Sequence, residues 1–282
     1  MTPAAPSTEQ IRQSWDAIAP GFDEFVSPLT MTFGDEIVGR ADIGPGTKVL
    51  DVGAGSGALA IPAARRGADV LAVDLAPAMI ERLTARATTL PNLRGRVMDG
   101  QALDLDDDSF DVAVSLNGVS LFPDVDAGIA EMARVTRPGG RVAIACFARG
   151  IEYAEFIAFF VSAIRTGVPD AALPPFDPPP PPFQLADPEK LSGKLLDAGL
   201  TRVSVESANW EVTVRSATHF WDAATASNPI AVRLIAGLTA EQRADARQVL
   251  DGMLRERSHG SPMAVLHNAM NIGTGIKPRT SQ

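Results

Sequence analysis

The most constraining feature of the sequence is a glycine-rich turn between an apolar run at residues 48–52 and a helical pattern at residues 58–66. Glycines in such a turn let a ligand approach the backbone and expose N–H groups at the start of the helix. A second apolar run ends at Asp74, an acid placed to accept hydrogen bonds from both hydroxyls of a ribose. Together these features predict a site for a nucleoside-containing cofactor.

The pattern of strands and helices continues through the first half of the chain. Strands are expected at residues 48–52, 70–74, 96–99, 110–116 and 141–147, with helices at 58–66, from Pro77 onward and at 127–135. Strands that alternate with helices form a parallel sheet covered on both faces. The sequence therefore predicts an α/β fold with a doubly wound, Rossmann-like sheet.

Both flanks of this region have a different pattern. A capping box of Ser7 and Gln10 predicts an N-terminal helix that ends before Pro20. The second half predicts an apolar helix at 152–164, a stiff proline-rich segment at 174–183, a helix at 187–198, strands at 203–206, 210–214 and 263–272, and helices across 218–257. Connections longer than ~12–15 residues are rarely unstructured. We therefore expect residues 216–260 to form a helical insert.

The charge balance and the rare residue types exclude several classes of function. The chain has 25 basic and 34 acidic residues and a net charge of −9, which disfavours nucleic acid and anionic membranes as partners. One cysteine and three widely spaced histidines favour neither a disulfide framework nor a metal site. No apolar run approaches the ~18 residues of a membrane span, and the N-terminus lacks a signal-peptide pattern. These features predict a cytoplasmic protein without a metal.

Two further acids favour S-adenosylmethionine over a dinucleotide as the cofactor. Asp51 lies two residues before Gly53, where its carboxylate would compete with a pyrophosphate for the same N–H groups but could pair with the amino group of a methionine moiety. Asp99 ends the third predicted strand, a position suited to the edge of an adenine. Gly53, Gly55 and Ala58 still satisfy the relaxed dinucleotide motif, so an NAD-dependent oxidoreductase remains an alternative.

Four segments in register carry a resemblance to a known family: LDVGAGSGALA, VLAVDLAPAMIERL, MDGQALDLDDDSFDVAVS and IAEMARVTRPGGRVAIA. With them the chain resembles the class I S-adenosylmethionine-dependent methyltransferases, most closely the subgroup of ubiquinone and menaquinone biosynthesis. The resemblance implies a seven-stranded sheet, mostly parallel with an antiparallel last strand. It also implies that an N-terminal segment with Trp15, Phe22 and Phe25 covers the cofactor. Ala76 departs from the pattern, because a serine N-cap is expected there.

The resemblance assigns a role to each motif. The glycine loop would hold the methionine part of the cofactor, Asp74 the ribose and Asp99 the adenine amino group. Asn117 follows the fourth predicted strand, at the edge where α/β proteins bind ligands, and is a further candidate. The predicted cofactor-binding residues are Asp51, Gly53, Ala54, Gly55, Gly57, Asp74, Leu75, Asp99, Gly100 and Asn117.

The expected organisation follows from the motifs and the flanking patterns. We expect an N-terminal helical cap at 1–34, an S-adenosylmethionine-binding core at 35–150, a continuation of the core with a proline-rich insert at 151–215, the helical insert at 216–260, and a last strand and tail at 261–282. The helical insert would wall the acceptor site together with Tyr153, Phe156 and Phe160. The alternative is that it forms a homodimer interface.

The expected activity is direct, in-line methyl transfer to oxygen, nitrogen or carbon of a small, fairly apolar molecule. A sulfonium cofactor carries its own leaving group, so the protein needs alignment and exclusion of water more than a catalytic base. His219 and His267 are weak candidates for such a base. An alternative is a protein of the same fold that binds S-adenosylmethionine but catalyses a non-methylating reaction.

Overall fold

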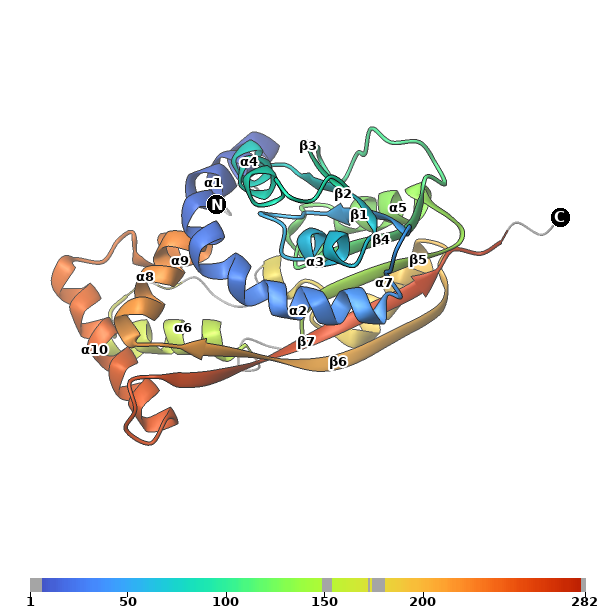
Figure 1. Cartoon of the computed structure of the whole chain (residues 1–282). Helices are drawn as coiled ribbons and strands as arrows, with labels where there is room; N and C mark the ends of the chain where they lie inside the picture. Colours follow the sequence, from blue (N-terminus) through green and yellow to red (C-terminus); the bar gives the residue numbers. More distant parts are fainter. Residues whose placement is uncertain (1–6, 149–153, 172, 174–180, 280–282) are drawn as a thin grey trace.

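A seven-stranded sheet in the order β3-β2-β1-β4-β5-β7-β6 forms the centre of the molecule (Figure 1). The structure is a computed structural model that describes residues 7–148, 154–171, 173 and 181–279. The strands are β1 Lys48–Val52, β2 Asp69–Asp74, β3 Leu93–Val97, β4 Phe110–Leu116, β5 Thr136–Phe147, β6 Thr201–Val214 and β7 Ala264–Ile276. Strands β1 to β5 pair in parallel, whereas β7 is antiparallel to both β5 and β6. The predicted doubly wound, Rossmann-like fold is confirmed.

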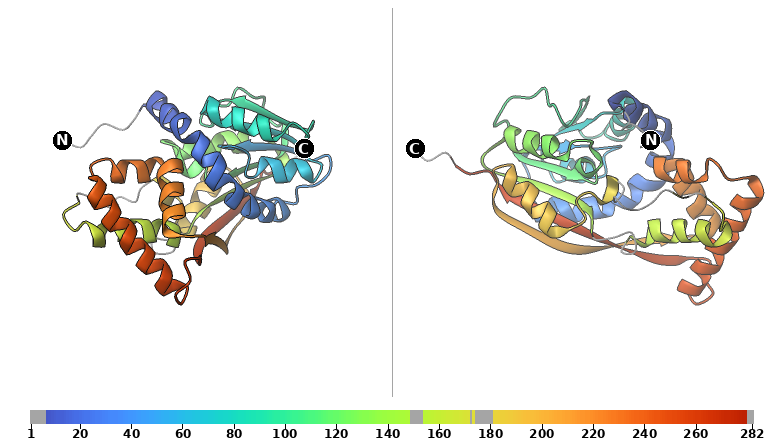
Figure 2. Two further views of the ribbon diagram at one scale, coloured as in Figure 1. Left: turned by 60° about the vertical axis from the view of Figure 1, so that its left-hand side comes forward. Right: turned by 180° about the vertical axis from the view of Figure 1, so that it is seen from behind.

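Helices cover both faces of the sheet (Figure 2). The first face packs against α2 Ser27–Arg40, α3 Ala60–Arg65 and α4 Pro77–Arg86, and the second against α5 Val125–Val135 and α7 Pro188–Asp197. Successive strand residues alternate between the two layers, so Val49 joins the first core and Leu50 the second. This burial on both faces explains why the strand sequences are continuously apolar.

The N-terminal arm, which we define as residues 7–40, is one continuous helical segment. The predicted capping box of Ser7 and Gln10 begins α1, Thr8–Gly21. The prediction that this helix ends before Pro20 is wrong, because Pro20 lies inside it. A π-helical segment, Phe22–Val26, follows directly and leads into α2 without a loop. A π-helical turn shifts the register of backbone hydrogen bonds, so the direction of the side chains changes between α1 and α2.

Several other elements differ from their predicted bounds, among them β5, which begins at Thr136 rather than at residue 141, and β7, which ends at Ile276 rather than at residue 272. Helix α3 begins at Ala60, so Pro62 falls in the first turn, where no N–H donor is needed. Strand β3 covers residues 93–97 rather than 96–99. The two strands predicted at 203–206 and 210–214 form a single strand, β6, because the polar residues between them keep their pairing with β7.

Strands β6 and β7 continue past the rest of the sheet as a two-stranded ribbon (Figure 1). The last residue of β5, Phe147, pairs with Met270, so residues 264–269 of β7 extend beyond the carboxyl edge of the parallel strands. The helical unit, defined as α8 Ala217–Ser227, α9 Pro229–Ile235 and α10 Ala240–Arg257, lies on this ribbon. It shares a separate apolar core with α6, Glu155–Gly167.

Candidate functional site

The predicted cofactor-binding residues gather at one edge of the sheet. Strands β3, β2, β1 and β4 are neighbours and run in parallel, so the loops that follow them meet at their carboxyl ends. Asp51 lies in β1, Asp74 ends β2, and the others lie in the connecting segments. The members of this set, by segment, are Asp51; Gly53, Ala54, Gly55 and Gly57; Asp74 and Leu75; Asp99 and Gly100; and Asn117.

The backbone N–H groups of the glycine loop are used within the protein. Gly53 and Ala54 donate to the carbonyl oxygen of Val73 at 2.9 and 3.0 Å. Gly55 donates to Oδ2 of Asp74 at 2.8 Å. Gly53 and Gly55 have φ angles of 70° and 53°, a left-handed backbone conformation that favours glycine. A pyrophosphate needs these N–H groups as donors, so the loop as built is unsuited to the dinucleotide mode of binding.

The glycine loop lies against the turn after β4. A Cβ atom built on Gly53 would stand 2.7 Å from Cα of Gly118, and one built on Gly118 would stand 2.6 Å from the carbonyl oxygen of Val52. Ser115 holds this junction, since its hydroxyl donates to Val52 O at 2.7 Å and accepts from Val119 N at 3.0 Å. The sequence analysis missed Gly118 and Ser115. The only local signal was the glycine that directly follows Asn117.

Buried oxygen atoms without partners point to a ligand at this junction. Asp51 is 1 % exposed, and neither of its carboxylate oxygens has a hydrogen-bond partner. The pKa of Asp51 is raised to about 7, chiefly by burial; the nearby N–H of Ala60 lowers it in part, and the charge of Asp74 adds to the rise. Oδ1 of Asn117 is also buried without a partner. Buried polar atoms are normally hydrogen-bonded, so these acceptors fit a ligand that brings N–H donors.

The other two predicted acids are held by their neighbours. Asp74 accepts from Ala76 N at 2.9 Å as well as from Gly55. Burial raises the pKa of Asp74, and these two N–H groups act in the opposite direction. Asp99 Oδ1 accepts from the backbone N and the side-chain Nε2 of Gln101, at 2.9 and 3.0 Å. Both carboxylates are therefore oriented before any ligand binds.

The N-terminal arm covers the glycine loop. A Cβ built on Gly55 would lie 3.2 Å from Cε1 of Phe22, which itself meets Trp15 edge to face. The hydroxyls of Ser27 and Ser56, both buried, form a hydrogen bond between the arm and the loop. These contacts keep water from one side of the loop.

The two histidines lie in different environments. His219 begins the helical unit, and its ring meets that of Phe25 at 5.7 Å between centroids. Burial lowers the pKa of His219, and the charge of Arg215 lowers it further. Nε2 of His219 lies 2.9 Å from Arg215, and because a guanidinium only donates, this nitrogen is the acceptor. His267 lies on the ribbon with its side chain 45 % exposed, beside Glu211. Only His219 thus lies next to the arm that covers the glycine loop.

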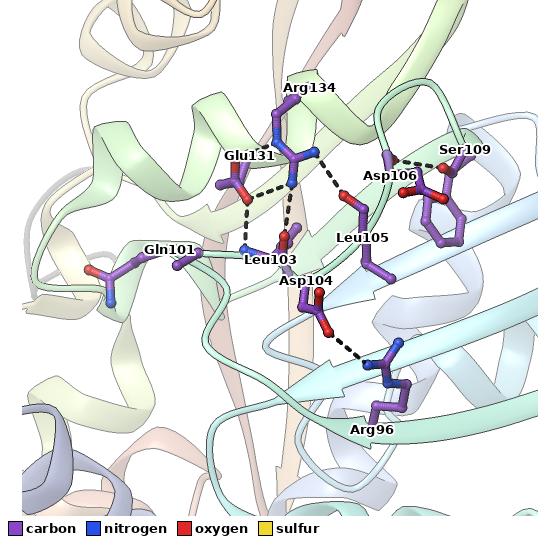
Figure 3. A pocket seen from close by; sticks show the side chains of 11 residues that line it. Arg96, Gln101, Leu103, Asp104, Leu105, Asp106, Ser109, Glu131 and Arg134 are labelled. Atoms are coloured by element: carbon purple, nitrogen blue, oxygen red, sulfur yellow. Dashed lines mark hydrogen bonds and ion pairs between the residues drawn. The ribbon is translucent and has the colours of Figure 1, made fainter.

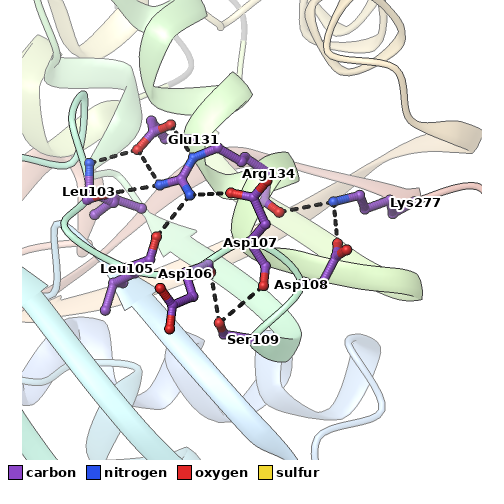
Figure 4. A network of polar contacts seen from close by, with 9 residues as sticks. All are labelled: Leu103, Leu105, Asp106, Asp107, Asp108, Ser109, Glu131, Arg134 and Lys277. Atoms are coloured by element: carbon purple, nitrogen blue, oxygen red, sulfur yellow. Dashed lines mark hydrogen bonds and ion pairs between the residues drawn. The ribbon is translucent and has the colours of Figure 1, made fainter.

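A shallow hollow of about 790 Å³ lies between the β3–β4 connection and α5 (Figure 3). Arg96 and Arg134 are the cations on its wall, and Figure 4 shows that the guanidinium of Arg134 is already engaged. It contacts Glu131 and Asp107, each at 2.6 Å, and donates to the carbonyl of Leu103 at 2.9 Å. Glu131 in turn accepts from Leu103 N at 2.7 Å. The network therefore anchors the connection that begins at Asp99.

The described part of the chain has neither a metal-binding cluster nor a membrane-spanning helix. Among these residues, no group of three or more His, Cys, Asp or Glu side chains is arranged to hold a metal ion. No helix there is long and apolar enough to cross a membrane.

Comparison with known protein families identifies the segment that carries the site. Residues 50–144 match the model of a methyltransferase domain. The uncharacterized protein Rv1405c of Mycobacterium tuberculosis is 42 % identical over 123 residues, which cover 43 % of this chain and 43 % of that protein. The demethylmenaquinone methyltransferase of Corynebacterium efficiens is 36 % identical over 124 residues, which cover 42 % of this chain and 52 % of that enzyme. The matched segments thus span about half the length of these relatives or less.

Solved structures agree in fold. The [4+2]-cyclase SpnF superposes with a TM-score of 0.61 at 16 % identity, covering 98 % of both chains. The Haemonchus contortus phosphoethanolamine N-methyltransferase 2, solved with S-adenosyl-L-methionine, gives a TM-score of 0.53 at 19 % identity, covering 88 % of this chain and 53 % of that one. With the family match, these findings confirm the resemblance to class I methyltransferases that the four sequence segments predict.

Proposed function

We propose that this chain, with its methyltransferase domain at residues 50–144, is an S-adenosylmethionine-dependent methyltransferase acting on a small, fairly apolar molecule. The observation that carries the proposal is the pair of buried, unpartnered acceptors, Asp51 and Asn117, beside a glycine loop whose N–H groups are already used. A cofactor with an ammonium group supplies what these acceptors lack. A pyrophosphate would bring a negative charge to the same place.

Each predicted residue has a role in this proposal. Asp51 pairs with the amino group of the methionine moiety, and Asn117 accepts a further hydrogen bond from it. Asp74 binds the ribose hydroxyls, because a carboxylate has about four lone-pair sites and the N–H groups of Gly55 and Ala76 leave part of this capacity free. Asp99, oriented by Gln101, receives the adenine amino group.

The protein contributes positioning and the exclusion of water. S-adenosylmethionine, when bound, supplies an activated methyl group on a sulfonium. The glycine loop and the junction at Gly118 fix the position of the cofactor, and the N-terminal arm closes over it through Phe22. The rate of methyl transfer depends mainly on holding the two reactants in line, because well-oriented reactants need little further catalysis.

The surroundings of the edge support an apolar acceptor. Phe147 ends β5, the strand that pairs with the one preceding Asn117. The ring of Phe147 lies 5.7 Å from that of Phe183. Ala154 and Ile157 pack with them. In the helical unit, Phe220 meets Phe156 at 4.6 Å between centroids. We propose that the acceptor binds between this apolar wall and the helical unit. A homodimer and a cytoplasmic location stay predictions.

Calorimetry with S-adenosylmethionine, S-adenosylhomocysteine and NAD tests the cofactor. The proposal expects both sulfur compounds to bind and NAD to bind more weakly. Tighter binding of NAD than of S-adenosylhomocysteine would overturn it. Transfer of a labelled methyl group to a panel of phenols, quinols and amines then tests the reaction. Binding of the cofactor with no transfer to any acceptor class would instead favour the non-methylating alternative.

A further inference from the structure

Helix α4 begins without a cap of its own. Its N-cap residue is Ala76, in an extended conformation with φ −90° and ψ 112°, and alanine has no side-chain acceptor. Pro77 has no N–H and Met79 N donates to the carbonyl oxygen of Ala76 at 3.1 Å, so the N–H of Ala78 is the donor of the first turn that lacks a local partner. This helix directly follows Asp74, so the way it begins determines the shape of the turn that carries the ribose-binding acid.

The missing cap is supplied by the N-terminal arm. Oδ1 of Asp16, on α1, accepts a hydrogen bond from the N–H of Ala78 at 2.9 Å, across 62 residues of sequence. In the same turn, Ala76 N donates to Oδ1 of Asp74 at 2.9 Å. Two hydrogen bonds, joined through the backbone of residues 76–78, thus connect α1 to the turn after β2 and to Asp74.

Apolar and ionic contacts hold α1 against α4 in this position. Ile18 and Ala19 pack against Ala76 and Met79 in a small cluster of their own. At the far end of α4, Nε of Arg86 lies 2.6 Å from the carboxylate of Asp23, which follows α1 in the π-helical segment. The arm is therefore docked at both ends of α4.

We propose that Asp16 is a positioning residue of the cofactor site, which caps α4 in trans and thereby couples docking of the arm to the shape of the Asp74 turn. This inference rests on the proposed function. When α1 leaves, α4 loses its cap and Asp74 loses the fixed turn that orients it. Closure of the arm over the cofactor and formation of the ribose site are then one cooperative event.

Asp16 acts through its hydrogen bond rather than through its charge. Its negative charge opposes ionisation of Asp74 and is among the causes that raise the pKa of Asp74. Arg12 lies 2.6 Å from the other oxygen of Asp16 and partly neutralises it. A neutral acceptor of the same shape should therefore replace Asp16, because asparagine is as good an N-cap as aspartate.

The test compares three variants by calorimetry with S-adenosylhomocysteine. Asp16→Ala should weaken binding about tenfold, since about 1.4 kcal/mol lies within the range for loss of one N-cap. Asp16→Asn should bind within about twofold of the parent. Asp16→Ala combined with Ala76→Ser, which restores a local cap, should regain most of the loss. The matched control is Asp35→Ala, an exposed acid of the same arm that pairs only with Arg66 and should leave binding unchanged.

A second readout needs no ligand. Hydrogen exchange of peptides spanning residues 75–86 should be faster in Asp16→Ala than in the parent, and slow again in the double variant. Unchanged exchange and unchanged affinity in Asp16→Ala would overturn the proposal, as would a loss that Ala76→Ser fails to restore. If the parent binds no S-adenosylhomocysteine, the proposed function fails, whereas the exchange experiment still decides whether Asp16 caps α4.

Discussion

Asp51 and Asp74 lie on neighbouring strands, and the negative charge of Asp74 adds to the burial that raises the pKa of Asp51 to about 7. Two acids side by side in a buried site repel each other unless one is protonated or a cation lies between them. Near neutral pH, part of the Asp51 carboxyl in the ligand-free protein is therefore expected to carry a proton.

Asp51→Asn should stabilise the protein above neutral pH. The folded-state pKa is about 7 and the ordinary value is 3.8, so between these values only the folded chain binds the proton. The contribution of this carboxyl to the free energy of unfolding is therefore largest near pH 4 and below, falls as the pH rises to 7, and is constant above pH 7. The free energy of unfolding of the variant should exceed that of the parent by about 2 kcal/mol at pH 8 and by little at pH 5. The gain at pH 8 is limited because the buried amide also lacks hydrogen-bond partners. Urea unfolding at both pH values measures this, and equal gains would contradict it.

Cofactor binding should release a proton near neutral pH and weaken as the pH falls. An ammonium group beside Asp51 favours the carboxylate, so the protonated fraction is lost on binding. Calorimetry of S-adenosylhomocysteine in buffers with different heats of ionisation measures this release directly. In Asp51→Asn the release should disappear. A parent protein with pH-independent affinity between pH 6 and 8 would remove Asp51 from the contact.

Asp74→Ala should weaken binding of S-adenosylhomocysteine by about tenfold or more. Hydrogen bonds to a charged acceptor contribute roughly 1.5–3 kcal/mol each, and the ribose offers two donors. Asp69→Ala is the matched control, because Asp69 begins the same strand at the opposite edge and pairs with exposed Arg94. Equal affinities of the two variants would mean that the end of β2 does not face the ribose.

Asp99 should tolerate asparagine better than alanine. The amide keeps an acceptor oxygen at the same place, so Asp99→Asn should lower the affinity for S-adenosylhomocysteine modestly, and Asp99→Ala should lower it more. Near-ultraviolet difference spectra on titration with S-adenosylhomocysteine report the adenine itself. Parental affinity in both variants would show that the segment after β3 lies away from the adenine.

The histidines should contribute little as bases. Nε2 of His219 already accepts from Arg215, so removing the ring costs chiefly the contact with Phe25. His219→Gln should lower kcat less than tenfold and leave the pH–rate profile unchanged, whereas removal of a general base typically costs about 10²–10⁴-fold. His267→Gln, with its exposed ring on the ribbon, serves as the control. Loss of a limb of the pH profile in His219→Gln would make it the base.

The sheet and its order of motifs could be predicted because each signal is local. A buried strand, a glycine turn and an acid at the strand end lie within a few residues, so the elements of residues 48–147 are recovered, with shifted bounds at β3 and α3 and a β5 that begins at Thr136 rather than at residue 141. The sequence predicts two strands in place of β6 because residues 207–209 lie outside the two runs that alternate like strand, and only their pairing with β7 keeps the strand continuous. The sequence predicts a helix end before Pro20 because the π-helical segment after it has no sequence signal.

The candidate site depends on contacts that no local pattern reveals. Asp16 meets Ala78, and Phe22 meets Gly55, only after the arm has folded back on the core. Ala76 was noted from the sequence as a missing cap, but its partner could not be found without the structure. Gly118 is likewise required only because Gly53 packs against it so closely that no side chain fits, and this contact is visible only in the structure.

The two-stranded ribbon lies between the strands that carry the predicted cofactor-binding residues and the helical unit. The helical unit can therefore vary while those strands stay constant. The register of β7 against β5 ends at Met270, and six residues of ribbon lie between that pair and the helical unit. A different set of helices could be joined between Val214 and Ala264 without moving any strand that carries a cofactor residue. The ribbon is thus a suitable place to replace the helical unit with helices from a related protein. Such chimaeras should keep the nucleoside-binding site, while their selectivity for the second substrate should be that of the protein that supplied the helices.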